Sequence, residues 1–351
     1  MAPATESGLV FEVQTLTSKI VAPDGTPVEK PVEIRTDPVT GRTCRVTYAR
    51  AAEKETGTAA LPEPPPAAAD REACPFCRPQ MNRRTPTLAA DLADADRLEK
   101  GDSVLFPNLF PYGRYSAVSL FDDRHFVEIG KASRQSYTDS FHNCRRYLKR
   151  VHASDPAAVY MAITQNHLPS AGGSLVHPHL QVHADRCPPN HLRFLEQRTN
   201  DYHARTGRGL FSDYLSCERE AGSRLIGQTG NWHWMAAFAP EGFFEIWGIL
   251  PGICSLFGLD ADHWNCLSQG VLNTQQFYRS LHRNGYNLGL LAIETAGSRL
   301  EIRVRILARS NYAPWVRNDH TGYEVMLGDM ATFNAPEETA ALARPFFSKD
   351  L

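Results

Sequence analysis

Hydrophobic and polar residues alternate most regularly between Ser174 and His183. Side chains of an extended strand point alternately to its two faces, so the apolar residues of this segment share one face and the polar residues share the other. The polar face carries His177, His179, Gln181 and His183. Three imidazoles and an amide cost free energy when they are buried without partners. We therefore predict a strand whose polar face holds a metal ion, an anionic ligand, or both.

Other parts of the first half show strand, loop and helix patterns. Residues 32–35 and 43–48 are rich in strand formers and flank a proline-glycine turn, so we expect a hairpin. Residues 51–70 are rich in proline and alanine, which favours an irregular loop. Residues 133–152 carry apolar side chains at helical spacing. Residues 160–164 are typical of a buried strand, which then leads into a glycine loop and the histidine strand.

The second half repeats this order. Residues 260–283 predict a long amphipathic helix, and residues 286–294 and 300–308 predict two further strands. We interpret the repetition as a weak internal duplication. The expected fold class is α+β, with two similar halves that each consist of an antiparallel sheet and packed helices. We place the first domain at residues 1–188 and the second at residues 189–351.

Composition and charge exclude several classes of protein. The 351 residues are 42% hydrophobic and 22% charged, with a formal net charge of −2, which is typical of a soluble globular protein. Nucleic acid is not an expected partner, because no broad basic excess would neutralise a phosphate backbone. We expect no membrane partner, since no apolar run is long enough to cross a bilayer. The first residues lack a basic start and an apolar core, so we expect no signal peptide.

The eight cysteines are dispersed, which favours reduced thiols and a cytoplasmic location over a disulfide framework. Cys74 and Cys77 alone form a close CxxC pair. This pair fits a metal site, a redox pair or two core cysteines. A zinc site needs two further ligands, which distant parts of the sequence can supply, and His125 and His177 are the candidates.

His179 is a candidate nucleophile. Imidazole is substantially neutral at physiological pH, so its free nitrogen can attack a phosphorus centre without a separate strong base. A second metal ligand or a hydrogen-bonded strand histidine are the alternatives. The preceding loop, which contains Gly172, Gly173 and Ser174, offers close backbone approach and donors that suit phosphate oxygens.

Together, Asn166, Gly172, Ser174 and the run from His177 to Gln181 resemble the active-site signature of galactose-1-phosphate uridylyltransferases, a branch of the histidine-triad superfamily. The spacing from Asn166 to His177 also matches. Other segments resemble that family in the same order along the chain, such as Asp37-Pro38-Val39-Thr40-Gly41, Phe106-Pro107-Asn108 and Gly322-Tyr323-Glu324-Val325-Met326.

The resemblance implies two histidine-triad-like halves and a covalent nucleotidyl intermediate on His179, assisted by Gln181 and Ser174. It implies a nucleotidyltransferase that moves a nucleoside monophosphate, by resemblance UMP, between a nucleotide sugar and a phosphorylated acceptor. A homodimer is also implied. Zinc (Zn2+) would be bound by Cys74, Cys77, His125 and His177. Substrate contacts are implied for Arg50, Asn108, Asn166, Gly172 and Gly173.

The departures from the family pattern lie mainly in the second half. Leu109 replaces an acidic residue of the nucleoside pocket. The histidines of a second metal site are replaced by Leu291 and by the pair Glu301 and Arg303, and His191 stands where the family has a ligating glutamate. We therefore expect no second metal in this half and an acceptor other than galactose 1-phosphate.

Two alternative functions remain at this point. A dinucleoside polyphosphate phosphorylase or nucleotide hydrolase is supported by His183, because simple histidine-triad hydrolases use a row of three alternating histidines. Gln181, however, stands where their third histidine would be. A noncatalytic nucleotide or metal sensor is the other alternative, and the presence of both His179 and Gln181 argues against it.

Overall fold

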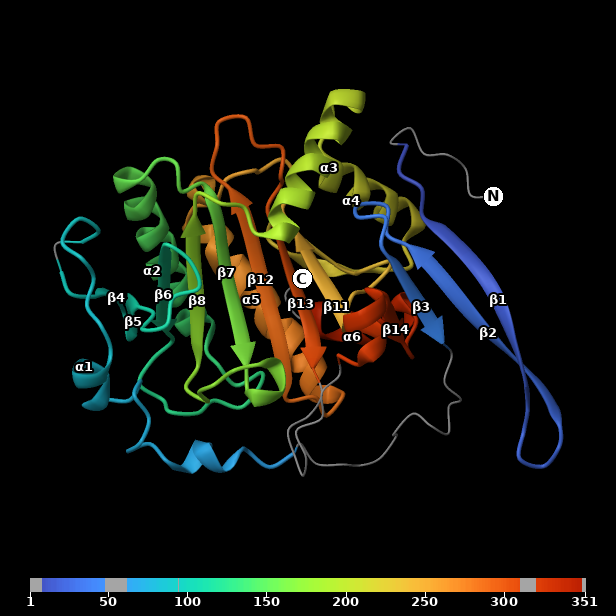
Figure 1. Cartoon of the computed structure of the whole chain (residues 1–351), viewed down its shortest axis with the longest axis horizontal. Helices are drawn as coiled ribbons and strands as arrows, with labels where there is room; N and C mark the ends of the chain where they lie inside the picture. Colours follow the sequence, from blue (N-terminus) through green and yellow to red (C-terminus); the bar gives the residue numbers. More distant parts are fainter. Residues whose placement is uncertain (1–7, 48–61, 94, 310–319, 349–351) are drawn as a thin grey trace.

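The structure is a computed structural model that describes residues 8–47, 62–93, 95–309 and 320–348. Its centre is a ten-stranded sheet in the order β4-β5-β6-β8-β7-β12-β13-β11-β10-β9 (Figure 1). The first half contributes β4 (Leu98–Lys100), β5 (Ser103–Pro107), β6 (Tyr115–Leu120), α2 (Arg134–Ser154), β7 (Tyr160–His167) and β8 (His179–Asp185). The second half contributes β9 (Leu225–Thr229), β10 (Trp232–Ala236), β11 (Phe243–Ile249), α5 (Ala261–Ser280), β12 (Gly285–Ile293) and β13 (Arg303–Arg309).

The two halves have the same connectivity, which confirms the predicted duplication. In each half, three strands precede a long helix, two strands follow it, and the last strand pairs with the third. His179 begins β8 opposite Leu120, the last residue of β6. Arg303 begins β13 opposite Ile249, the last residue of β11. The halves join through antiparallel pairing of β7 with β12, so the two predicted sheets form one continuous sheet.

One face of this sheet is covered by α2 and α5. Alternate residues of β8 and β13, such as Leu180, Val182, Val304 and Ile306, are buried in the same apolar cluster as these helices. Because side chains alternate along a strand, the residues between them point to the opposite face. His179, Gln181, Arg303 and Arg305 therefore share that second face.

Over the second half, this opposite face is covered by α3 (Asn190–Thr206), α4 (Leu210–Ala221) and part of a smaller four-stranded sheet. The smaller sheet has the order β1 (Glu12–Val21), β2 (Pro27–Thr36), β3 (Thr43–Thr47) and β14 (Met330–Thr332). The predicted hairpin is the β2-β3 pair, up to residue 47. The remaining helices are η1 (Pro66–Ala69), α1 (Gln80–Arg84), η2 (Pro169–Ala171), η3 (Leu256–Gly258), η4 (Tyr323–Leu327) and α6 (Pro336–Phe347).

The β1-β2 hairpin extends from the body as an arm (Figure 1). Every residue of β1 is exposed. The arm leads into β3, which pairs in parallel with β14 from near the other end of the chain. These N-terminal strands pack on the second half, and the division at residues 188 and 189 falls between β8 and α3, so two separate domains stay a prediction. Among the described residues, no helix is long and apolar enough to span a membrane.

Candidate functional site

The four predicted metal ligands lie together. Cys74, Cys77, His125 and His177 are all buried, and one donor atom from each lies within 4.8 Å of the others. The Cys77 Sγ atom is 3.3 Å from Nδ1 of His125 and 3.4 Å from Nδ1 of His177. The sequence placed these ligands on three separate segments, and the fold brings all three to one end of β8.

Hydrogen bonds orient both histidines toward the cluster. Nε2 of His125 is 2.8 Å from the carbonyl oxygen of Ala67, and Nε2 of His177 is 3.0 Å from that of Asp122. A carbonyl oxygen only accepts, so each Nε2 carries the hydrogen and each Nδ1 directs its lone pair at the cysteines. Two sulfur and two nitrogen donors in this arrangement fit a tetrahedral metal ion.

His179 is held with one nitrogen available. Its Nδ1 lies 2.7 Å from the carbonyl oxygen of His177 and donates to it, so the lone pair is on Nε2. The rings of Phe76 and His179 pack edge to face at 5.3 Å between centroids. Burial lowers the pKa of His179 below its ordinary value, which favours the neutral imidazole. The side chain thus keeps the lone pair on Nε2, and its burial favours the neutral form.

A chain of amide hydrogen bonds runs from Gln181 into the second half. Nδ2 of Asn166 donates to Oε1 of Gln181 at 3.4 Å, and Nδ2 of Asn287 donates to Oδ1 of Asn166 at 2.7 Å. Asn287 also donates to the carbonyl of Ala171 at 2.9 Å and accepts from Arg309 at 2.7 Å. Sequence reasoning missed Asn287. Only the pairing of β12 with β7, which places it opposite Asn166, identifies it.

The glycine loop is shaped by its own hydrogen bonds. The amide of Gly172 donates to Pro169 and that of Gly173 donates to Leu168, each at 3.0 Å. Both amides thus donate within the loop, and the expected contact of Gly172 and Gly173 with a phosphate stays a prediction. A Cβ atom on Gly173 would lie 2.9 Å from the carbonyl oxygen of Asn166, so this position has no room for a side chain. Ser174 is exposed.

The remaining candidate residues are Asn108, His183 and Arg50. The side chain of Asn108 accepts from the amide of Phe110 at 3.1 Å and so shapes the turn between β5 and β6. His183 lies 3.2 Å from the hydroxyl of Ser116, on the same face as Gln181. Arg50 lies outside the described residues.

Comparisons with known proteins place the fold. No family model matches the chain. An uncharacterized protein from Archaeoglobus fulgidus is 26% identical over 339 residues, which cover 97% of this chain and 99% of that protein. A crystal structure of an ADP-glucose phosphorylase from Arabidopsis thaliana with bound ADP-glucose has a TM-score of 0.69 at 20% identity, and the match covers 89% of this chain and 98% of that one.

Two further solved structures agree. A GalT-like protein from Arabidopsis thaliana has a TM-score of 0.67 at 19% identity, covering 89% of this chain and 98% of that one. A uridylyltransferase has a TM-score of 0.65 at 18% identity, covering 91% and 99%. The sequence resemblance is thus confirmed at the level of the fold, which this chain shares with these three proteins.

Proposed function

We propose that this chain is a nucleotidyltransferase that works through a covalent nucleotidyl intermediate on His179. The observation that carries the proposal is the orientation of His179, whose Nδ1–H is bound to a carbonyl while Nε2 keeps its lone pair. Gln181 lies on the same face of β8, two residues along the strand. The substrates are a nucleotide sugar and a phosphorylated small molecule.

The reaction has two displacements. Nε2 of His179 attacks the α-phosphorus of the donor, a P–N bond forms, and the bond from that phosphorus to the bridging oxygen breaks, so that a sugar phosphate leaves. A phosphate oxygen of the acceptor then attacks the same phosphorus, and the P–N bond breaks. Oε1 of Gln181 accepts from Asn166, so the amide nitrogen of Gln181 is the group that donates to a nonbridging oxygen. Ser174 is assigned to the departing phosphate.

The four-ligand cluster is assigned to zinc, because sulfur and imidazole donors in a tetrahedral set suit this ion. When bound, the ion cross-links the CxxC loop to the start of β8 and has no open position for chemistry. We expect about one equivalent of zinc per chain by metal analysis. Cys74→Ser should lower the melting temperature and the metal content more than it lowers the rate of transfer. Less than a third of an equivalent in protein never exposed to chelator would contradict the assignment.

A phosphorylase is the second candidate. The fold neighbour with a TM-score of 0.69 is an ADP-glucose phosphorylase, which supports inorganic phosphate as an acceptor. The first displacement is the same in both candidates, and only the acceptor of the second displacement differs. The same neighbour supports adenosine as an alternative to the uridine that the sequence resemblance implies. A dinucleoside polyphosphate as donor, or water as acceptor, would follow the same scheme.

One experiment tests the shared step. The protein is incubated with UDP-glucose, ADP-glucose and dinucleoside polyphosphates labelled on the α-phosphate, and the label retained on protein is measured. A phosphoramidate is labile in acid and survives base, so this stability identifies the histidine link. His179→Ala should abolish labelling and turnover, and Gln181→Ala should slow both, whereas the control variant His203→Ala, at a partly exposed position of α3, should match the wild type. Near-normal turnover in His179→Ala would refute the mechanism.

Acceptors are compared in the second half of the same experiment. Labelled enzyme is chased with inorganic phosphate, glucose 1-phosphate and galactose 1-phosphate, and the products identify the acceptor. We expect galactose 1-phosphate to be a poor acceptor, because the second half differs from the family there. A cytoplasmic homodimer completes the proposal. The eight free cysteines support the cytoplasmic location, and the sequence resemblance supports the dimer.

A further inference from the structure

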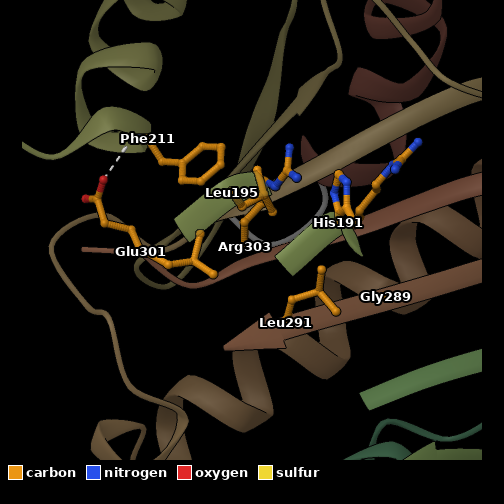
Figure 2. A pocket seen from close by; sticks show the side chains of 9 residues that line it. His191, Leu195, Phe211, Gly289, Leu291, Glu301 and Arg303 are labelled. Atoms are coloured by element: carbon orange, nitrogen blue, oxygen red, sulfur yellow. Dashed lines mark hydrogen bonds between the residues drawn. The ribbon is translucent and has the colours of Figure 1, made fainter. Parts of the chain in front are cut away.

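A cavity lies in the second half, between the sheet and the helices α3 and α4, on the same face as His179. Its volume is about 120 Å³. Figure 2 shows its lining, with Leu291 and Gly289 on β12, Arg303 on β13 and His191 at the start of α3. This is room for a small ligand and not for a whole nucleotide.

Arg303 is a buried residue that lines this cavity. Its guanidinium carbon lies 4.0 Å from the ring centroid of Trp247 and 4.7 Å from that of Phe211. The planes of these two rings are 83° apart, so the planar guanidinium, with its five N–H groups, can stack face to face on only one of them. The residue is only 9% exposed, and no described residue accepts a hydrogen bond from it or forms an ion pair with it. Its neighbour Arg305 is paired with Glu245 at 2.6 Å.

His191 adds a second unused group. Its Nε2 atom is buried without a hydrogen-bond partner. Burial and the nearby Arg303 lower the pKa of His191 to about 4, so the ring is neutral and carries one N–H donor. The carboxylate in the lining is Glu301, and backbone amides of Phe211, Ser212 and Gly252 already donate to it. The described lining therefore offers donors without a free acceptor.

The internal duplication gives this cavity a defined position. Arg303 begins β13 where His179 begins β8, and each faces away from the long helices. The cavity is thus the counterpart, in the second half, of the site of the proposed chemistry. Three strand spacings of about 4.8 Å separate β8 from β13, so the two positions lie well apart on one sheet face.

We propose that this cavity binds a phosphate-type oxyanion, either free phosphate or the phosphoryl group of a small molecule, independently of His179. The planar guanidinium of Arg303 donates to two oxygens of the anion, and His191 donates to a third oxygen. A carboxylate has only two oxygens, so it cannot use all of these donors. The apolar side chains of Leu195, Leu291 and Leu300 exclude water and strengthen these charged hydrogen bonds.

Calorimetric titration with inorganic phosphate tests the proposal. Arg303→Gln should weaken phosphate binding by about tenfold or more, since it removes a charged bidentate donor. The surface variant Arg219→Gln loses the same charge and should bind like the wild type. His179→Ala should keep this binding as well, which separates the outcome from the fate of the proposed nucleophile. Glucose 1-phosphate, titrated in parallel, distinguishes a phosphoryl group from free phosphate.

Leu291→Phe provides a second variant, because it fills the cavity and leaves its charge unchanged. We expect it to weaken phosphate binding too, and it decides the question if Arg303→Gln does not fold. Phosphate affinity equal to wild type in folded Arg303→Gln or Leu291→Phe would overturn the proposal. So would wild-type protein that binds no phosphate at about 10 mM, a concentration at which even millimolar sites are mostly occupied.

Discussion

At the residue scale, His179 and Arg303 occupy the same structural position in the two halves and have different surroundings. Both begin the final strand of a half, and both face away from the long helix. The carbonyl that binds Nδ1 of His179 leaves a lone pair for bond formation. The guanidinium of Arg303 lies over two aromatic rings and has no hydrogen-bond partner among the described residues. The first arrangement suits an attack on phosphorus, and the second suits recognition of an anion.

Asn287 allows a sharp test of the amide chain. Asn287→Asp keeps the shape of the side chain but loses both donated hydrogen bonds, to Asn166 and to Ala171. We expect the rate of nucleotidyl transfer to fall roughly tenfold, the kinetic equivalent of one hydrogen bond. Metal content should be unchanged. The surface variant Gln228→Ala serves as control, and a normal rate in Asn287→Asp would show that Gln181 needs no such support.

At the scale of elements, the first turn of α4 is capped by Glu301, which lies two residues before β13. Glu301 is 2% exposed and accepts from the amides of Phe211 and Ser212 at 2.8 and 2.9 Å, in the first turn of the helix. A Cβ atom on Gly209 would lie 2.6 Å from this carboxylate, so glycine there makes room for it. Glu301 stands where the resembled family has a histidine of its second metal site, and in this chain it caps a helix.

We expect Glu301→Gln to destabilise the fold by about 1–3 kcal/mol, because the amide turns one acceptor into a donor that faces backbone N–H groups. Chemical denaturation monitored by circular dichroism measures this change. Glu220→Gln, on the exposed face of α4, removes the same charge and should change stability by less than about 0.5 kcal/mol. Equal stability of the two variants would contradict the capping role.

Glu337, in the first turn of α6, joins three elements. It accepts from Arg35 of β2 at 2.9 Å and from Arg224, just before β9, at 2.8 Å. Burial raises the pKa of this carboxyl, but the hydrogen bonds and charge of Arg35 outweigh burial and lower the pKa to about 2 from an ordinary 4.5. The folded state thus favours the ionised form. Its stabilising effect is full above pH 4.5 and is lost as the pH falls toward 2.

We expect Glu337→Gln to cost on the order of 1–2 kcal/mol at pH 7, a figure reduced for partial exposure of the pair. The difference from wild type should shrink between pH 4.5 and 2. Unfolding free energies measured across this range provide the check. A difference that stayed constant down to pH 2.5 would mean that the charge of Glu337 is not what stabilises α6.

At the scale of the whole molecule, one sheet and the amide chain link the halves. The pairing of β7 with β12 lies between His179 in the first half and the buried tryptophans of the second half. These tryptophans are Trp232, Trp234, Trp247 and Trp264. We expect tryptophan fluorescence and nucleotidyl transfer to be lost at the same denaturant concentration. Two separated transitions would instead support independent domains at residues 1–188 and 189–351.

The sequence predicts features that local pattern and motif spacing encode. The alternation around His179 indicates a strand with a chemical face. The family resemblance implies that Cys74, Cys77 and His125 share one metal site, and the fold brings them together. The duplication follows from repeated helix and strand patterns. Long-range pairing is not encoded in this way. The contact of Asn287 with Asn166 depends on how β12 meets β7, and the hydrogen bonds that use the amides of the glycine loop depend on its backbone turns.

The exposed arm has a consequence for the solubility of this protein. β1 is ten residues long and lies at the edge of its sheet, so one side of its backbone is available to pair with another strand. Leu16 and Ile20 are each 41% exposed, but Lys19 lies between them in sequence and near Glu29. Charge on an edge strand opposes stacking of copies. We therefore expect Lys19 to oppose aggregation through this strand when the protein is concentrated.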